Sequence, residues 1–198
     1  MKEMIKNTLI LLAITVVAGF VLGFVYENTK DTIAYREEEN IKASYRNVFS
    51  DADYFEEALL AAKTFDVDEY SNCSIDSLNI AYDKDKNALG YVFTITSKEG
   101  YGGDITFTVG IRKNGVINGI SILSISETAG LGMEADKILR PQFAGKQVEH
   151  FVYTKTGSAA PEEIDAISGA TVTTNAFTNG VNLGLYYFNK YLGGADNE

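Results

Sequence analysis

Three glycine-bearing stretches hold the residues whose types and spacing could do chemistry. They are EGYGGD (99–104), SETAGLGMEAD (126–136) and DAISGATVTT (165–174). Glycines let a backbone approach a planar ligand closely, Tyr101 offers a stacking face, and Leu131 is an apolar side chain in a polar loop. Ser168 or Thr171 could cap a following helix, whose unpaired N–H groups and partial positive charge favour an anionic phosphate. By themselves these residues leave tight turns and helix capping open beside a ligand site.

Other kinds of site have little support in the composition. Cys73 and His150 are the only cysteine and the only histidine, which argues against a disulfide, an iron–sulfur cluster, a zinc site or a Ser-His-Asp triad, so no metal is expected. A hydrolase with Ser168 or Thr171 as nucleophile lacks a convincing base, because Lys155 would need a depressed pKa. The formal net charge of −10 argues against a nucleic-acid partner.

The N-terminal region predicts a membrane anchor. Residues 8–26 carry no charge, and 19 helical residues span about 28 Å, close to the thickness of a bilayer core. A cleaved signal peptide is the competing interpretation, but its apolar region would be shorter and followed by an A-x-A-like site. Lysines and arginines flank the span almost evenly, so charge leaves the orientation open. Thr15, Gly19 and Gly23 place small surfaces on one helix face, which favours close helix packing or reflects the frequency of glycine in membrane helices.

The remaining sequence predicts an α+β domain. A helical lead-in is expected over 31–65, with a second helix in its later part. Alternating apolar residues then predict an antiparallel meander, with Asn114-Gly115 as a hairpin turn. A short helix stopped near Pro141, a further strand and a long helix from about Val172 to Leu192 should follow. The expected architecture is a single transmembrane helix in residues 1–30 and a domain over 31–198 that has an antiparallel sheet and flanking helices.

Two of the motifs together resemble a known family. DAISGAT resembles the Asp-x-x-Ser/Thr-Gly-Ala-Thr signature of covalently flavinylated FMN-binding domains, and ETAGLG resembles their Glu-Thr-x-Gly-Leu-Gly loop. Ala129 stands where many members have Pro. The resemblance extends over essentially the whole chain and is to the G subunits of Rnf electron-transport complexes. A more distant resemblance is to the C subunit of the sodium-pumping NADH:quinone reductase.

The resemblance implies a cofactor and the residues that hold it. One FMN per chain would be attached covalently through its phosphate to Thr171. Asp165, a residue of the DAISGAT motif, would orient that threonine or contact the flavin transferase that installs FMN. The other implied FMN contacts are Ser168, Gly169, Ala170, Glu127, Thr128, Gly130, Leu131, Gly132, Tyr101 and, by a weaker match, Lys155.

The resemblance also implies a place and a role. The chain would be an electron-relay subunit of an ion-translocating ferredoxin:NAD oxidoreductase, with no complete catalytic cycle of its own. Its N-terminus would be cytoplasmic and its FMN domain extracytoplasmic. Its partners would be the other Rnf subunits, including the other covalently flavinylated one, and the transferase. The alternatives are a C-type subunit of the sodium-translocating reductase and a membrane-anchored binding or scaffold module without flavin.

Overall fold

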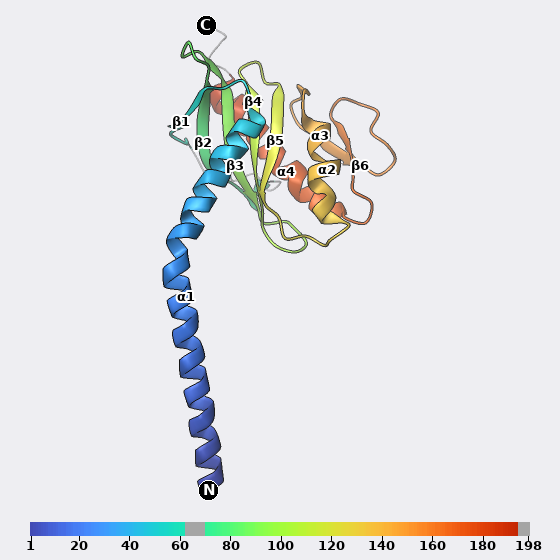
Figure 1. Cartoon of the computed structure of the whole chain (residues 1–198). Coiled ribbons are helices and arrows are strands. Elements are labelled where there is room, and N and C mark those ends of the chain that lie inside the picture. Colours follow the sequence, from blue (N-terminus) through green and yellow to red (C-terminus); the bar gives the residue numbers. More distant parts are fainter. Residues whose placement is uncertain (62–69, 194–198) are drawn as a thin grey trace. The chain divides into compact units, whose positions relative to one another are not determined.

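The computed structural model describes residues 1–61 and 70–193, and the chain divides into two units, Met1–Ile41 and Lys42–Glu198. Figure 1 shows the elements in order. Their bounds are α1 (Lys2–Val48), β1 (Tyr54–Ala58), β2 (Cys73–Tyr82), β3 (Ala88–Ser97), β4 (Ile105–Arg112), β5 (Ile117–Ser124), η2 (Gly132–Glu134), α2 (Ala135–Ile138), α3 (Arg140–Phe143), β6 (Val152–Thr154), β7 (Glu163–Asp165), α4 (Thr171–Tyr187) and the π-helical η3 (Phe188–Leu192).

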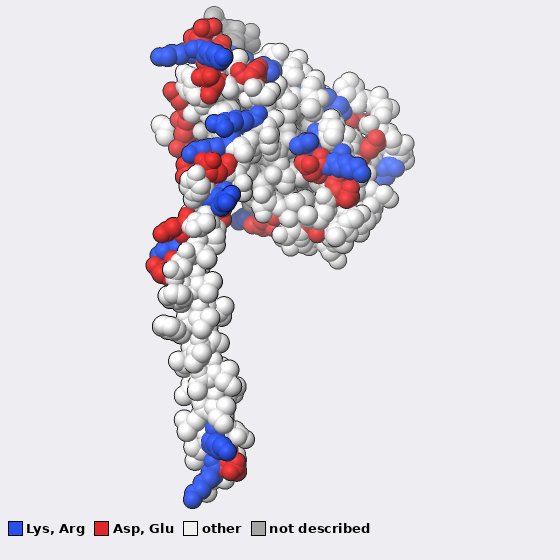
Figure 2. All heavy atoms as spheres, in the orientation of Figure 1, with Lys and Arg blue, Asp and Glu red and all other residues white. Residues whose placement is uncertain are grey.

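The first unit is the N-terminal part of α1. Its most apolar 18-residue window has a mean hydropathy of 2.7, and none of that window is buried within the protein. Figure 2 shows this part of the helix without charged side chains, between charged segments at either end. In the described part of the chain, α1 is the one helix long and apolar enough to cross a membrane.

The second unit is built on a five-stranded antiparallel sheet in the order β1-β2-β3-β4-β5. The predicted alternation is present: Phe93, Ile95 and Phe107 are fully buried on the face that α4 covers (Figure 1). Phe107 stacks on Phe177 of α4 with ring centroids 4.4 Å apart. The hairpin at Asn114-Gly115 is also present, and Gly115 supplies the positive φ, +82°, that such a turn needs.

The opposite face of the sheet has a recess for the end of α1. A Cβ at Gly90 would lie 2.7 Å from the Phe49 ring, and one at Gly110 would lie 2.9 Å from it. Only glycine leaves room for this fully buried phenylalanine. The Asn118 amide donates a hydrogen bond to the Val48 carbonyl, so the last turn of α1 is fixed to the domain.

The predicted helical lead-in is wrong beyond Val48. Residues 54–58 form the edge strand β1, which pairs with β2, and residues 62–65 lie outside the described part of the chain. Tyr54 stacks on Tyr82 with ring centroids 5.1 Å apart. Backbone pairing and this ring contact override the local helix propensity of the segment.

Two further expectations need correction. Pro141 does not end a helix: α2 ends at Ile138, and Pro141 lies in the first turn of α3, where its missing N–H costs nothing. The strand expected over 148–155 is only three residues long. It pairs with β7 in parallel, as a two-stranded sheet separate from the main one.

Candidate functional site

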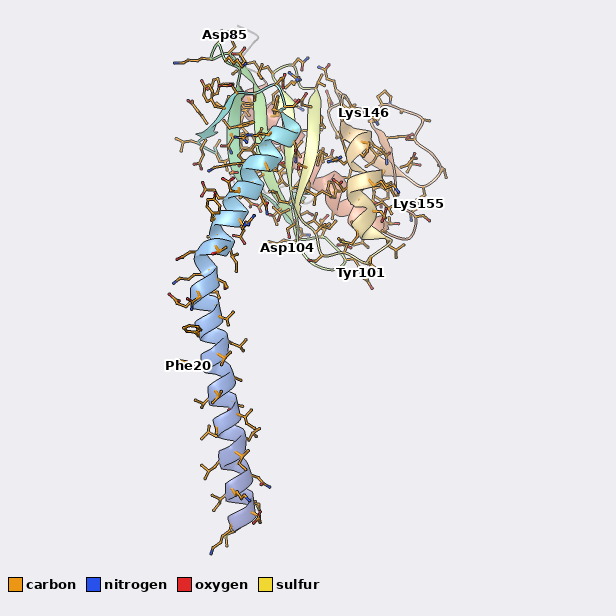
Figure 3. The ribbon with its side chains drawn as sticks, in the orientation of Figure 1. Phe20, Asp85, Tyr101, Asp104, Lys146 and Lys155 are labelled. Atoms are coloured by element: carbon orange, nitrogen blue, oxygen red, sulfur yellow. The ribbon has the colours of Figure 1, made fainter. Side chains whose placement is uncertain are left out.

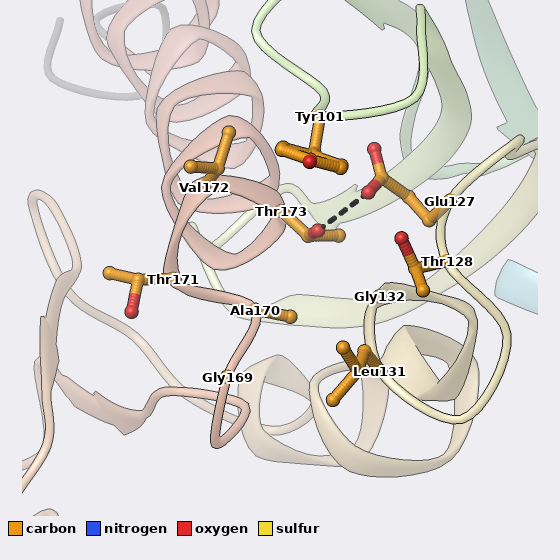
Figure 4. Close-up of a pocket in the computed structure, with 10 residues that line it drawn as sticks. All are labelled: Tyr101, Glu127, Thr128, Leu131, Gly132, Gly169, Ala170, Thr171, Val172 and Thr173. Atoms are coloured by element: carbon orange, nitrogen blue, oxygen red, sulfur yellow. Dashed lines mark hydrogen bonds between the residues drawn. The ribbon is translucent and has the colours of Figure 1, made fainter.

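The three glycine-bearing stretches meet at one cleft of about 530 Å³ (Figure 4). One stretch joins β3 to β4, the second follows β5, and the third leads into α4. The volume lies in the range of small-molecule and cofactor sites. The lining residues are Tyr101, Glu127, Thr128, Leu131, Gly132, Gly169, Ala170, Thr171, Val172 and Thr173.

The loop after β5 is folded so that it presents an apolar side chain. The N–H groups of Leu131 and Met133 both donate to the Thr128 carbonyl, at 3.1 and 3.2 Å. Gly130 precedes them with φ of +74°, which a residue with a side chain adopts only with strain. The tight turn leaves Leu131 38% exposed beside the cleft.

Glu127 ties this loop to the other two stretches. The Thr173 hydroxyl donates to its Oε2 at 2.9 Å, the dashed line in Figure 4, and the Gly102 N–H donates to its Oε1 at 3.2 Å. Gly132 makes this arrangement possible, because a Cβ there would lie 2.6 Å from the Thr173 Oγ1 and 2.8 Å from the Glu127 Oε2. The half-buried carboxylate therefore lies at the point where all three stretches meet.

A second carboxylate holds the β3–β4 connection against α4. The side-chain amides of Asn175 and Asn179 donate to Glu99 Oε2 at 3.2 and 2.7 Å. Sequence reasoning missed this role of Glu99, and it also missed Val172 and Thr173 as lining residues. The available signal was the spacing of Asn175 and Asn179, which places two amides on one face of a helix.

The N-terminus of α4 opens onto the cleft without a side-chain cap. The N-cap residue is Ala170, so the expected capping by Ser168 or Thr171 is wrong. The hydroxyl of Thr174 instead accepts the Ile167 N–H and donates to the Ala170 carbonyl. Within the described residues, the N–H groups of residues 171–173 have no hydrogen-bond partner. An anionic group at this position would meet free donors and the positive end of the helix dipole.

Thr171 is the first residue of that helix and is half-buried. No hydrogen bond to its hydroxyl is found among residues 1–61 and 70–193. Figure 4 shows its side chain on the side of the first turn opposite Glu127. Gly169, with φ of +78°, turns the chain just before the helix.

Comparison with known proteins identifies the family. A model of the RnfG N-terminal region matches residues 1–48, and a model of the FMN-binding domain matches residues 100–186. The G subunit of the proton-translocating ferredoxin:NAD(+) oxidoreductase complex of Clostridium ljungdahlii is 30% identical over 179 residues, which is 90% of this chain and 88% of the relative. The chain belongs to the RnfG family.

Other relatives in this family differ in how much of the chain they match. The G subunit of the Na(+)-translocating ferredoxin:NAD(+) oxidoreductase complex of Acetobacterium woodii is 38% identical over 102 residues, about half of each chain. The G subunit of an ion-translocating oxidoreductase complex of Aliivibrio fischeri is 25% identical over 210 residues, covering 96% of this chain and 93% of the relative. The crystal structure of Shewanella oneidensis NqrC has the same fold, with a TM-score of 0.51, 19% identity and coverage of 71% of each chain.

The structure brings together eight of the twelve residues expected at the site. The eight that line the cleft are Tyr101, Glu127, Thr128, Leu131, Gly132, Gly169, Ala170 and Thr171. Gly130 and Ser168 do not line it, although each is next to a residue that does. Lys155 is exposed on the connection after β6 (Figure 3) and does not line the cleft.

Asp165 does not line the cleft either, and its carboxylate is used elsewhere. Oδ1 accepts the Ser158 N–H at 2.5 Å, and Oδ2 accepts the Ser158 hydroxyl at 3.3 Å. This motif residue therefore fixes the connection between β6 and β7.

The donor set and the apolar lining suit a flavin nucleotide. Leu131 and Val172 are 38% and 48% exposed, and Tyr101 is 75% exposed, so apolar surface is available to a planar ring. The free N–H groups of α4 suit a phosphate. Within the described residues no group of three or more His, Cys, Asp or Glu could hold a metal ion.

Proposed function

We propose that this chain is the flavin-carrying G subunit of an ion-translocating ferredoxin:NAD oxidoreductase, a redox subunit that relays electrons. The observation that carries the proposal is the cleft itself. The ETAGLG loop and the SGAT turn, which are separated in the sequence by α2, α3, β6 and β7, line the same cavity beside an uncapped helix N-terminus. That arrangement supplies an apolar surface for the ring and free N–H donors for the phosphate.

We further propose that one FMN is linked covalently through its phosphate to Thr171. Four hydroxyl groups lie close together in sequence here, and three are unsuited. Thr173 donates to Glu127, Thr174 is bonded to the backbone on both sides, and Ser168 lies outside the cleft. Of these four residues, Thr171 alone lines the cleft and has a hydroxyl with no hydrogen bond among the described residues. A phosphate held there would face the unpaired N–H groups of residues 171–173.

The chain's residues would bind and orient the cofactor. Leu131, Val172 and Tyr101 would pack against the ring and exclude water from it. Glu127 would hold the two loops and α4 in fixed relative positions through its hydrogen bonds with Gly102 and Thr173. Flavin when bound supplies one- and two-electron transfer. Covalent attachment would prevent its loss on a face of the membrane where no FMN pool replaces it.

The apolar part of α1 and membership of the RnfG family support a membrane-anchored protein. We propose that the N-terminus is cytoplasmic and that residues 31–198 are extracytoplasmic. The partners would be the other subunits of the complex, including the other covalently flavinylated one, and a separate flavin transferase. Fusion of alkaline phosphatase to the C-terminus tests the orientation, since this enzyme is active only outside the cytoplasm; an inactive but intact fusion would reverse the assignment.

The alternatives have weaker support. A C-type subunit of the sodium-translocating NADH:quinone reductase rests on a likeness at 19% identity, which concerns the fold alone, whereas relatives that are G subunits match almost the full chain. A scaffold module without flavin does not account for the uncapped N-terminus of α4 or for the exposed apolar side chains of Leu131 and Val172.

Co-expression of the full chain with a flavin transferase tests the attachment. We expect flavin fluorescence that survives denaturing gel electrophoresis and a mass increase of one FMN less one water. Thr171→Ala should abolish both, while Ser168→Ala, a matched loss of one hydroxyl three residues earlier, should keep both. A colourless wild type, or a flavinylated Thr171→Ala variant, would contradict the proposal.

A further inference from the structure

Among the described residues, Glu127 is the acidic residue that lines the cleft. Its carboxylate lines the cavity together with Leu131 and Thr171. Both of its oxygens accept hydrogen bonds from neutral donors, the Gly102 N–H and the Thr173 hydroxyl. Within the described residues no lysine or arginine forms an ion pair with it. The cleft therefore contains a negative charge that no cation from this part of the chain neutralises.

The surroundings hold this charge in place. The Thr173 side chain is 1% exposed, so its hydroxyl has a fixed position against Oε2. Gly132 packs against both partners, and a Cβ there would lie 2.7 Å from the Glu127 Cβ. The carboxylate cannot swing into solvent without breaking two hydrogen bonds that connect three chain segments. A fixed charge in a partly desolvated site acts more strongly than one on a mobile surface side chain.

We propose that Glu127 lowers the midpoint potential of the flavin held in this cleft. The proposal rests on the FMN site proposed above. Reduction adds negative charge to the ring, and a fixed carboxylate in the same cavity opposes that charge by Coulomb repulsion. Glu127 would therefore make the flavin a stronger reductant than the same ring beside a neutral side chain. This role is electrostatic and additional to the clamping of the loops.

Glu99 provides a matched control. It also accepts hydrogen bonds from α4, through Asn175 and Asn179, and it clamps the same β3–β4 connection. It does not line the cleft. Glu99→Gln removes the same charge and leaves an amide oxygen as acceptor, as Glu127→Gln does. A merely structural role would make the two variants behave alike.

The experiment is a spectroelectrochemical titration of the flavinylated full chain in detergent. Intact mass first establishes that each variant carries FMN. We expect Glu127→Gln to raise the equilibrium constant for uptake of one electron about tenfold, a positive shift of about 59 mV. Glu99→Gln should shift the potential by less than a third of that amount. Thr173→Val, which is isosteric and removes the donor that fixes Oε2, should let the carboxylate move toward solvent and shift the potential in the same direction by a smaller amount.

The outcomes separate the two proposals. A wild type without covalent FMN overturns the proposed function and this inference with it. A loaded wild type whose potential is unchanged by Glu127→Gln, or changed equally by Glu99→Gln, overturns the electrostatic role alone. If Glu127→Gln fails to load, Thr173→Val decides: a potential equal to or more negative than that of the wild type contradicts the proposal.

Discussion

Gly132→Ala is expected to destabilise the domain by a steric conflict that the structure locates. The added Cβ would lie 2.6 Å from the Thr173 Oγ1, 2.7 Å from the Glu127 Cβ and 2.8 Å from its Oε2. Such distances force the neighbours apart, and overpacking of this kind costs about 1–3 kcal/mol. Separation of the Thr173–Glu127 pair also removes a hydrogen bond to a charged group, worth about 1.5 kcal/mol where the carboxylate is half-exposed. The expected total is about 3 kcal/mol.

For a domain of this size, about 3 kcal/mol corresponds to a decrease in Tm of roughly 6–12 °C. The assay is thermal unfolding of the full chain in detergent, followed by the near-ultraviolet circular dichroism of its tyrosines. Gly130→Ala is the matched control. No atom lies within 4 Å of a Cβ added at Gly130. The φ of +74° at this residue nevertheless implies strain of about 1 kcal/mol in the alanine variant, and so a decrease in Tm of roughly 2–4 °C. The steric argument would be refuted if the Tm of the Gly132→Ala protein equalled that of the wild type or exceeded that of Gly130→Ala.

Three further predictions concern the core. Phe49→Ala, which empties the recess against the sheet, should lower the free energy of unfolding by about 3–5 kcal/mol. In the same thermal assay, Tyr35→Ala, which removes an exposed side chain, should change this free energy by less than about 0.5 kcal/mol. Burial raises the pKa of the Cys73 thiol to about 11, so a thiol reagent at pH 8 should react only after unfolding, and rapid labelling of the native protein would contradict this. Asn182→Ala should cost about 2–4 kcal/mol, because its amide bonds both the N–H and the carbonyl of Phe151; a change below about 1 kcal/mol in denaturant titration would refute that role.

The sequence predicted the elements whose signals are local. An uncharged run of 19 residues marks a membrane-spanning helix, because hydropathy and length are properties of the run itself. The alternation in β3 and β4 and the Asn114-Gly115 turn predicted the meander for the same reason. The two motifs were sufficient to indicate the flavin family.

The errors arose where a distant contact decides the local structure. Residues 54–58 have no strong strand pattern and become β1 through pairing with β2. The role of Asp165 toward Thr171 or the transferase stays a prediction; the structure shows that its carboxylate accepts hydrogen bonds from Ser158. Capping by Ser168 or Thr171 was left open by the sequence, and the structure has Ala170 as the N-cap residue with no side-chain cap. A side chain's neighbours across the fold cannot be read from its neighbours in the chain.

The sequence by itself determined the apolar anchor, the strands and the identity of the motifs, because each depends on residue types at fixed spacing. The tertiary structure alone brought 99–104, 126–136 and 165–174 to one cleft. It also decided which hydroxyl is free: Thr173 and Thr174 are engaged by Glu127 and by the backbone, and the hydroxyl of Thr171 has no partner in the described structure. Four similar hydroxyl groups differ only in what surrounds them, and those surroundings come from segments far apart in the chain.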